Sequence, residues 1–499
     1  MRITNTMMMN QTLRNVNKSK YNLNTAENQM STEKKITRPS DDPIVAIRAL
    51  SLRASISEIE QYLNHNIPDA EAWIDVTETS MKNMDSILTD IYQYCNQGAS
   101  DQFTVNDRSA IIDVLKQYKT AIYAEANSDY AGRYCFTGYK TDTSFTFLTA
   151  EDAQKKYEIT ETFTSDDVTT MKVMKNSVDV TDIDTILAAD TPETEDVYRI
   201  RLAYDNCAAA LDSGETMELK VTTLDGTEKA YEPTAVTRKE FDELVANGTF
   251  DAGTASVYYI YDTGELAFTD DLYSEFNNCQ GMSFTFQKDR FDTGDPRPEM
   301  YFNCKDITDA TAPIDYKVNP TGQAISYTIN FSQSMQINTL GCDTLSYDIG
   351  RDIDDLCVAL QTVADIETKI TKLKDMHENG AYTDAEREEI ATMIEAANKE
   401  RDYALDSMEK TFSAELTKIT KYKEVVGLEL ADLGARSTRI TLTKARLTEQ
   451  HTTFSDLKSQ NEDVNLEDVV ISFSSAQTLY QAALTAASNC VQQSLLDYI

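Results

Sequence analysis

The sequence predicts a mainly α-helical protein with a β-rich insertion: a long antiparallel helical rod built from both chain ends, with an outward-facing, mostly β middle domain. Apolar residues recur at intervals of three and four along both ends, the spacing of helices that pack on other helices. The middle holds six of the nine prolines and nine of the sixteen glycines, and its apolar residues alternate with polar ones. We therefore expect terminal helices at 1–42 and 456–499, a helical rod core at 43–145 and 346–455, and an acidic insertion at 146–345.

The charge balance restricts the class of partner. The 499 residues carry a formal net charge of -37. A chain this acidic repels nucleic acid and anionic membrane surfaces, so we expect protein partners, with no nucleic acid and no membrane insertion. There is no run of 18 apolar residues, and the first fifteen residues lack the apolar segment of a secretory signal. We therefore expect neither a transmembrane helix nor a cleaved signal peptide.

The sequence contains no complete motif for catalysis or for a cofactor. Only three histidines occur, HExxH is absent, and so are the glycine-rich loops that bind phosphates. The acidic turns DTGE at 262–265 and DTGD at 292–295 lack the full spacing of a calcium loop. None of the eight cysteines forms a CxxC pair, and we interpret them as small buried residues. We predict no enzyme activity, no cofactor and no metal site.

Two adjacent acids between two prolines, in RPSDDP at 38–43, raise the question of a catalytic pair. A structural interpretation accounts for each residue. Pro43 suits the first position of a helix, where its missing N–H would have no partner anyway. Asp42 then precedes the helix as its N-cap, and Asp41 also lies near the positive helix end. We therefore expect a helix start here, between the terminal segment and the rod.

The two chain ends each carry a short, imperfect apolar stripe. We expect these stripes to pack against each other and against neighbouring copies, because short amphipathic helices are marginal alone. The predicted assembly residues are Met9, Leu13, Val16, Leu23 and Met30 in the first segment, and Phe473, Tyr480, Leu484, Val491 and Leu495 in the last.

The rod segments contain three features that test the helical interpretation. Pro68 falls inside the first long apolar stripe, so we expect a kink or a break there. Thr104 and Asp107 have the spacing of a capping box at a helix start, and Gly132 is expected to end that helix in the left-handed conformation. The charged segment 365–410 is longer than a simple return helix needs, and we interpret it as an extra helical hairpin.

The insertion is expected to be largely β. Residues 325–332 place Ile325, Tyr327, Ile329 and Phe331 on one face of a strand, and Asp225-Gly226 marks a hairpin. Two short helices are expected among these strands, at 184–189 and 238–246.

Five motifs occur in order along the chain: MRITNTMM at the start, RPSDDP at 38–43, YAGRYCFTG at 130–138, VGLELADLGAR at 426–436 and SLLDYI at 494–499. In this combination the chain resembles the flagellin family, and within it the subunits that join hook to filament. The resemblance covers roughly 1–145 and 410–499 and implies a flagellin-like helical core. Its motif residues in this chain are Asp41, Asp42, Pro43, Gly132, Arg133, Gly434 and Arg436.

The resemblance implies an extracellular structural protein of the bacterial flagellum. Such subunits leave the cell unfolded through the flagellar type III export channel and polymerise at the hook tip. The implied partners are further copies of the chain in a ring or helix, the other hook-associated junction protein, flagellin, and an export chaperone in the cytoplasm. A flagellin-type filament subunit remains the closest alternative; the proline of SDDP and the ending SLLDYI favour the junction subunit. An enzyme housed in the insertion and a cytoplasmic coiled-coil scaffold are the other classes considered.

Overall fold

The computed structural model describes residues 5–98, 103–180, 191–250, 255–309, 311–318, 322–379 and 382–496. It confirms a mainly helical chain with a β-rich middle. The chain divides into two compact units. Unit 1 consists of Met1–Glu71, Tyr327–Met335 and Ser437–Ile499, and unit 2 of Ala72–Ser326 and Gln336–Arg436.

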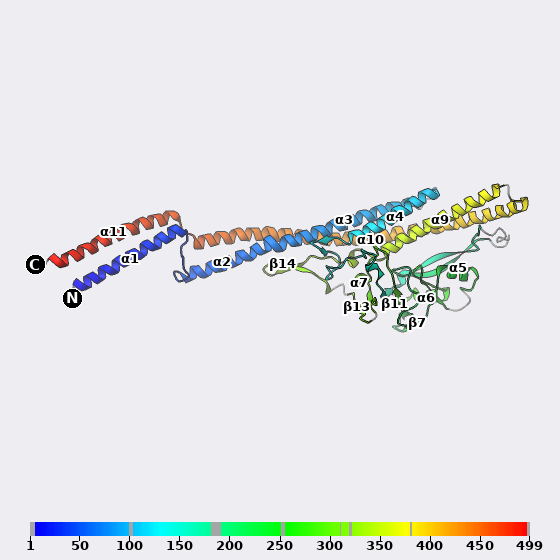
Figure 1. Cartoon of the computed structure of the whole chain (residues 1–499), viewed down its shortest axis with the longest axis horizontal. Coiled ribbons are helices and arrows are strands. Elements are labelled where there is room, and N and C mark those ends of the chain that lie inside the picture. Colours follow the sequence, from blue (N-terminus) through cyan, green and yellow to red (C-terminus); the bar gives the residue numbers. More distant parts are fainter. Residues whose placement is uncertain are drawn as a thin grey trace. The chain divides into compact units, whose positions relative to one another are not determined.

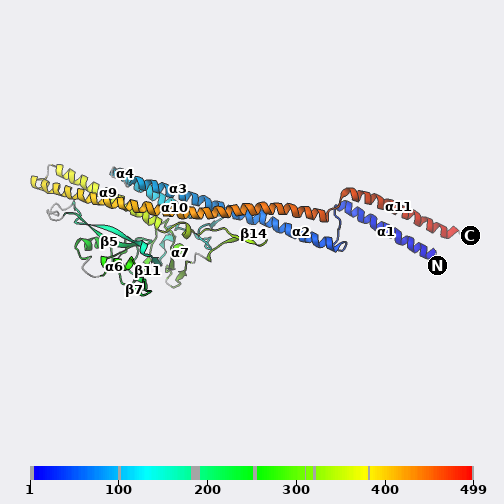
Figure 2. The ribbon, with the colours of Figure 1, turned by 180° about the vertical axis from the view of Figure 1, so that it is seen from behind.

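Unit 1 is helical apart from one small hairpin. Its helices are α1 (Asn5–Thr32), α2 (Pro43–Gln61), a π-helical turn (Tyr62–Asn66), the first residues of α3 (Ile67–Gly98), the last part of α10 (Asp384–Glu462), and α11 (Leu466–Leu496). Strands β14 (Ser326–Asn330) and β15 (Gln333–Gln336) form the hairpin. Figures 1 and 2 show α1 and α11, from opposite ends of the sequence, side by side along their length.

The break considered for Pro68 does not occur; the structure instead has a π-helical turn that ends just before α3. The backbone N–H of Ile67 bonds to the carbonyl oxygen of Tyr62, five residues back, and α3 continues directly from there. Proline lacks the N–H that would bond to the carbonyl oxygen four residues earlier, and a wider turn changes the local bonding pattern without ending the helix. The helical path therefore continues without a break. Tyr62 and Ile67 are both buried, five residues apart.

The helices of unit 2 begin and end at recognisable signals. They include most of α3, α4 (Val105–Glu125), α9 (Asp348–Glu378) and the first part of α10. The predicted capping box of α4 is confirmed: Asp107 N–H donates to the Thr104 hydroxyl, and the Asp107 carboxylate accepts from the Thr104 N–H. The predicted hairpin around 365–410 is confirmed as the end of α9 followed by the start of α10, which Thr383 and Glu386 cap.

Gly132 has the predicted left-handed conformation but lies in a different structure. Helix α4 ends at Glu125, and Gly132 (φ 78°) follows Ala131 (φ 53°) in the turn of a hairpin between β1 (Asp129–Tyr130) and β2 (Arg133–Tyr134). A two-residue turn with two positive φ angles matches the twist of antiparallel strands. The prediction of a helix C-cap was therefore wrong, since a hairpin uses the same glycine conformation.

Two sheets form the β-rich part of unit 2. The five-stranded sheet has the order β4-β5-β10-β9-β8, and the six-stranded sheet has the order β13-β12-β3-β11-β6-β7. Their strands are β3 (Tyr157–Phe163), β4 (Val168–Lys175), β5 (Glu193–Arg201), β6 (Leu219–Thr223), β7 (Glu228–Tyr231), β8 (Thr234–Val236), β9 (Val257–Ile260), β10 (Glu265–Phe268), β11 (Cys279–Lys288), β12 (Asn303–Asp306) and β13 (Ile314–Tyr316). All pairs are antiparallel except β8 with β9.

The core of the insertion draws on both sheets. Phe286 of β11, Ile200 of β5 and Phe268 of β10 belong to one buried cluster. A second, smaller cluster lies on the other side of the five-stranded sheet, where Phe241 and Val245 of α5 (Arg238–Ala246) pack with it. The remaining short helices are α6 (Asp270–Phe276), α7 (Pro298–Tyr301) and α8 (Gly341–Thr344).

Three of the local predictions for the middle can be compared with these elements. Helix 238–246 is confirmed as α5, and the hairpin at Asp225-Gly226 is confirmed by the pairing of β6 with β7. The helix predicted at 184–189 lies outside the described residues. The strand at 325–332 is confirmed as β14, in which Ile329 is buried. Phe331 follows the strand and stays partly exposed; its ring lies edge-on to that of Tyr62, with 5.7 Å between the ring centres. This hairpin belongs to unit 1 and not to the sheets.

Of the seven cysteines that the structure describes, none forms a disulfide and five are buried. Burial raises the pKa of Cys95 to about 12, which keeps its thiol protonated. Among the helices described, none has the length and apolar character needed to cross a bilayer.

Candidate assembly site

Helices α1 and α11 cover one stripe of each other and leave the rest of their surfaces open. The covered positions step by three and four, as in a coiled coil. They are Thr12, Val16, Ser19, Leu23, Ala26 and Met30 on α1, and Val469, Phe473, Ala476, Tyr480, Ala483 and Ala487 on α11. Of these, only Ala26 and Val469 are buried, and the others are half-buried. Half of this seam consists of alanine, serine or threonine, so the pair buries little apolar area by itself.

The predicted assembly residues divide between the two kinds of surface. The covered stripe contains Val16, Leu23, Met30, Phe473 and Tyr480, whereas Met9, Leu13 and Leu484 are exposed. Val491 and Leu495 lie in α11, but their side chains are outside the described part. The role of all these residues in contacts between copies stays a prediction.

Sequence reasoning missed further apolar residues that point away from the seam. Met7, Tyr21, Ile471 and Leu479 expose 62–67% of their surface. Each falls outside the two stripes that were read from the sequence. A helix that is apolar on several sides is typical of a buried environment, and this describes α11. The signal was present in α11, where few charged residues interrupt the apolar ones after Asp468.

Helix α2 repeats this pattern. Ala46, Ala49, Ile56 and Ile59 form its buried face. On the opposite side Ile44, Ile47 and Leu50 expose 62–68% of their surface. Three large aliphatic side chains in one helical turn and a half form a patch that a monomer leaves in water.

A joint connects the terminal pair to α2 and α10 within unit 1. The connectors 33–42 and 463–465 run antiparallel here: Lys35 N–H donates to the Glu462 carbonyl (2.7 Å), and Val464 N–H donates to the Glu33 carbonyl (3.1 Å). Lys34 forms an ion pair with Asp463, which raises the pKa of Lys34 and lowers that of Asp463. The joint is therefore ordered in the single chain.

RPSDDP forms the start of α2 as predicted. The Asp42 carboxylate accepts hydrogen bonds from the N–H groups of Ile44 (3.0 Å) and Val45 (3.2 Å), so Asp42 is the N-cap. Asp41 accepts from the Arg38 N–H at 2.9 Å and closes the preceding turn. Both carboxylates are occupied by backbone donors, and this supports the structural interpretation over the catalytic one.

Two further motif residues, Arg133 and Arg436, have packing roles. The Arg133 guanidinium lies 5.0 Å from the centre of the Trp73 ring, whose edge meets Tyr130. Arg436 donates to the Asn338 carbonyl at 3.0 Å and pairs with Asp432 one turn earlier. A Cβ atom added at Gly434 would meet no atom within 4 Å beyond its own stretch of helix.

Comparison with known proteins identifies both chain ends. The bacterial flagellin N-terminal helical region matches residues 3–141, and the bacterial flagellin C-terminal helical region matches residues 416–499. Both ends of the chain therefore match flagellin-family helical regions. These two flagellin regions contain the terminal pair, the joint and the exposed face of α2.

Individual relatives cover only part of the chain. The flagellar hook-associated protein 3 of Salmonella typhimurium is 28% identical over 145 residues, 29% of this chain and 45% of that protein. A flagellin of Clostridium tyrobutyricum is 30% identical over 126 residues, 25% of this chain and 33% of that protein. The chain thus spans about half the length of the curated hook-associated relatives it matches.

Solved structures with flagellar names also align over much of the chain. The flagellar junction protein FlgL from Legionella pneumophila is 10% identical, with a TM-score of 0.30, covering 84% of this chain and all of that one. FlgL from Xanthomonas campestris is 10% identical, with a TM-score of 0.26, covering 81% of this chain and 99% of that one.

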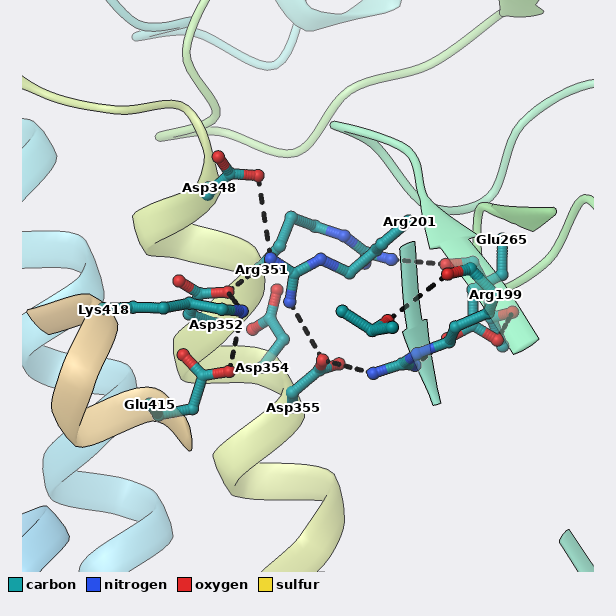
Figure 3. Close-up of polar contacts among 12 residues, drawn as sticks. Arg199, Arg201, Glu265, Asp348, Arg351, Asp352, Asp354, Asp355, Glu415 and Lys418 are labelled. Carbon is teal, nitrogen blue, oxygen red and sulfur yellow. Dashed lines mark hydrogen bonds and ion pairs between the residues drawn. The ribbon is translucent and has the colours of Figure 1, made fainter. Parts of the chain in front are cut away.

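A buried network of charges links the five-stranded sheet to the helices of unit 2, at the edge of the C-terminal flagellin region (Figure 3). Arg199 and Arg201 of β5 each donate to Asp355 of α9 at 2.9 Å. Arg201 also pairs with Asp352, and Arg199 with Glu265. Arginine suits buried ion pairs of this kind, because its planar guanidinium carries several N–H donors that can bond to more than one carboxylate.

Helix α10 completes this network. Lys418 donates to Asp352 and Glu415, both at 2.9 Å, and the Tyr422 hydroxyl donates to Asp352 at 2.6 Å. Burial, together with the charge of Asp352, raises the pKa of Glu415 to about 8. Burial opposes ionisation of Asp352 too, but Arg201 and Lys418 outweigh it and lower its pKa. The network holds β5, α9 and α10 together.

Among the described residues, no group of three or more His, Cys, Asp or Glu side chains has the geometry of a metal site. His451 of α10 lies 3.2 Å from the Glu60 carboxylate and is partly exposed.

Proposed function

We propose that this chain is a structural subunit of the bacterial flagellum that joins the hook to the filament. The observation that carries the proposal is the open apolar surface of the two flagellin regions. Such surfaces on α1, α2 and α11 are costly in water and favourable once another chain covers them.

The weak seam between α1 and α11 supports an assembly role. The pair buries few large side chains against itself, so its stability depends on what covers the outward residues Met7, Tyr21, Ile471 and Leu479. When one surface of each copy binds a different surface of the next copy, the repeated contact generates a ring or a helix. We propose further copies of this chain as the main partner, and the other hook-associated junction protein and flagellin as the neighbours on either side.

The location follows from the same proposal. A junction subunit acts outside the cell on the flagellum, reaches it by the flagellar export route without a cleaved signal peptide, and is guarded by a chaperone before export. The named hook-associated relatives favour the junction over the filament, and the flagellin relative keeps the filament subunit as the alternative. We propose no catalytic role.

The test places the tagged full-length chain in cells of its source organism that lack it. Electron microscopy with a gold-labelled antibody is expected to show label at the boundary between hook and filament, and motility is expected to return. Label along the whole filament would support the filament alternative, and label absent from the flagellum would contradict both.

The variant Ile471→Gln/Leu479→Gln tests the carrying observation. Both side chains are exposed, so the monomer is expected to keep its helical content and its melting temperature. Incorporation is expected to fall, with secreted subunit still found in the medium. The control is Leu224→Gln, an equally exposed leucine in the insertion. Normal incorporation of the double variant would mean that this face is not used.

A further inference from the structure

The two chain ends carry opposite charge. No acid precedes Glu27, and the bases before it are Arg2, Arg14, Lys18 and Lys20. No lysine or arginine follows Lys458, and the acids beyond it include Glu467 and Asp468 at the start of α11. The first segment is therefore a basic region in a chain whose net charge is -37.

Among the described residues, the bases of α1 have no ion-pair partner. Arg14, Lys18 and Lys20 are exposed, and none forms an ion pair with any residue the structure describes. Elsewhere in the described chain ion pairs are common, as for Arg53, Lys82 and Lys119. In so acidic a protein, an exposed base with no acidic partner is available to form an ion pair with an acid on another surface.

Two of these bases lie on the outer face of α1. Arg14 and Lys18 share their side with Met7 and Tyr21, at the spacing 7, 14, 18, 21. This spacing follows one helix face, and it is opposite the covered stripe at Val16, Ser19 and Leu23. The outer face therefore combines two positive charges with two exposed apolar side chains.

Helix α11 has an outer face of complementary charge. Glu467 shares its side with Ile471, Ser474 and Thr478, opposite the covered Phe473 and Tyr480. Asp468 lies next to Glu467 and is also exposed. This face therefore carries the negative charge of Glu467 beside an exposed isoleucine, and Asp468 lies at its flank.

The two sets of charges are too far apart to pair within one copy. The Lys34–Asp463 bridge brings the connectors of α1 and α11 to the same level. Lys18 precedes Lys34 by 16 positions, about 24 Å of helix, whereas Glu467 follows Asp463 by only four, about 6 Å. Lys18 and Glu467 are therefore separated by roughly 18 Å along the helix pair. An axial shift of that size between two copies would bring them together.

We propose that Arg14 and Lys18 of one copy form ion pairs with Glu467 and Asp468 of an adjacent copy, so that the outer faces of α1 and α11 meet and the charges set the axial stagger. This rests on the proposed function, because it names the partner surface of the same assembly site. The contact joins two different faces, so it repeats from copy to copy and closes a ring or continues a helix. The charges select the register, and Met7, Tyr21 and Ile471 supply apolar contact area beside them.

The experiment exchanges the charges in full-length chains. One variant carries Arg14→Glu/Lys18→Glu and is acidic at both ends; the other carries Glu467→Lys/Asp468→Lys and is basic at both ends. Each alone is expected to lower incorporation at the hook tip about tenfold or more, because like charges then face each other. Co-expression of the two variants is expected to restore incorporation, since each end then meets an opposite charge on its neighbour.

Two further chains separate the possible causes. Lys220→Glu/Lys239→Glu lowers the net charge as much as Arg14→Glu/Lys18→Glu does, at exposed sites in the insertion, and is expected to incorporate normally. The chain with all four end substitutions is expected to incorporate alone. Circular dichroism of each purified chain confirms folding, and subunit in the medium confirms export.

Normal incorporation of the single-sign variants would overturn the proposal. So would failure of the co-expressed pair while both chains are folded and exported, the result expected if α1 binds a different flagellar protein. The proposed function fails separately, if the wild-type chain does not label the boundary between hook and filament.

Discussion

Arg53 and Glu462 are 409 positions apart in the chain, and the Arg53 guanidinium donates two hydrogen bonds, of 2.8 and 2.7 Å, to the Glu462 carboxylate. Glu462 is almost fully buried, whereas Arg53 is largely exposed. The pair ties α2 to the end of α10 at the joint that leads to α1 and α11.

Loss of this pair is expected to loosen the terminal helices without unfolding the rest of the chain. In Arg53→Ala, the ion-pair partner that Glu462 keeps among the described residues is the more distant Lys34, at 3.7 Å. We expect a loss of about 1 kcal/mol, since one partner is exposed. Hydrogen exchange should become faster in α1 and α11 and stay unchanged in α9. The control is Lys82→Ala, which removes an exposed ion pair with Glu78. If α1 and α11 exchanged amide hydrogens at the same rate in both variants, the role of the joint would be contradicted.

Removing the N-cap of α2 is expected to destabilise that helix start. Asp42→Ala leaves the N–H groups of Ile44 and Val45 without their acceptor, at a cost of about 0.5–2 kcal/mol. Asp42→Asn keeps an oxygen acceptor and is expected to behave nearly as the wild type. Thermal unfolding by circular dichroism measures the difference. A variant with normal helix stability but lost biological activity would point to a chemical role for the carboxylate instead.

The stability of unit 2 is expected to depend on pH through Glu161. This side chain is fully buried in β3, and burial raises its pKa to about 8 from an ordinary value of 4.5. Between these values the folded chain holds a proton that the unfolded chain has released. The free energy of unfolding therefore falls as pH rises through this window, by up to about 1.4 kcal/mol per pH unit from this group.

Glu161→Gln removes this dependence, because the amide is neutral at every pH and its oxygen can still accept the bond from the Ala203 N–H. We expect the variant to melt higher than the wild type at pH 8.5 and to show a flatter profile from pH 5 to 8. Glu158→Gln, on the same strand, is the control. A wild-type profile that Glu161→Gln leaves unchanged would show that this carboxyl is ionised throughout.

The charge network makes a different prediction for Arg201. Its truncation, Arg201→Met, leaves Asp352 and Asp355 partly unpaired in a buried place, at a cost of about 3–5 kcal/mol. Adding Asp355→Asn should recover part of this loss, because one of the unpaired charges disappears. Urea unfolding followed by circular dichroism gives both values. Additive losses in the double variant would mean that Arg201 and Asp355 act independently.

The terminal helices are expected to be needed for assembly and not for the fold of unit 2. Deleting residues 466–499 removes α11 and uncovers α1, but it leaves the sheets and the charge network intact. The truncated chain should keep the melting transition of unit 2, appear in the medium and fail to support filaments. Filaments formed with the truncated chain would show that assembly does not depend on α11.

Much of the helical fold was predictable because local signals carry it. Asp42, Thr104 and Asp107 cap helices where their side chains and neighbours suggested. Apolar spacing also located the covered residues Val16, Leu23 and Phe473. These predictions needed only the residues within one or two turns of each position.

Other features depend on residues far apart in sequence. The α9 partner that Arg199 and Arg201 share, Asp355, lies more than 150 positions away, and no spacing rule connects it to them. Gly132 gave the correct backbone conformation but the wrong element, since a hairpin and a helix end make the same demand on glycine. For α11 a single stripe was an incomplete description, because Ile471 and Leu479 lie on other sides of the helix.

The π-helical turn at Tyr62–Asn66 contains one residue more than an α-helical turn would. The buried positions Ile56, Ile59 and Tyr62 are followed by Ile67 and Ala70, so the only irregular interval is the five-residue step across the turn. Taking one residue out of 63–66 would reduce this step to four and bring the buried positions on both sides into one regular phase. Elsewhere in these helices, deleting one residue would turn buried apolar side chains outward. The π-helical turn is therefore the position at which a one-residue deletion is best tolerated.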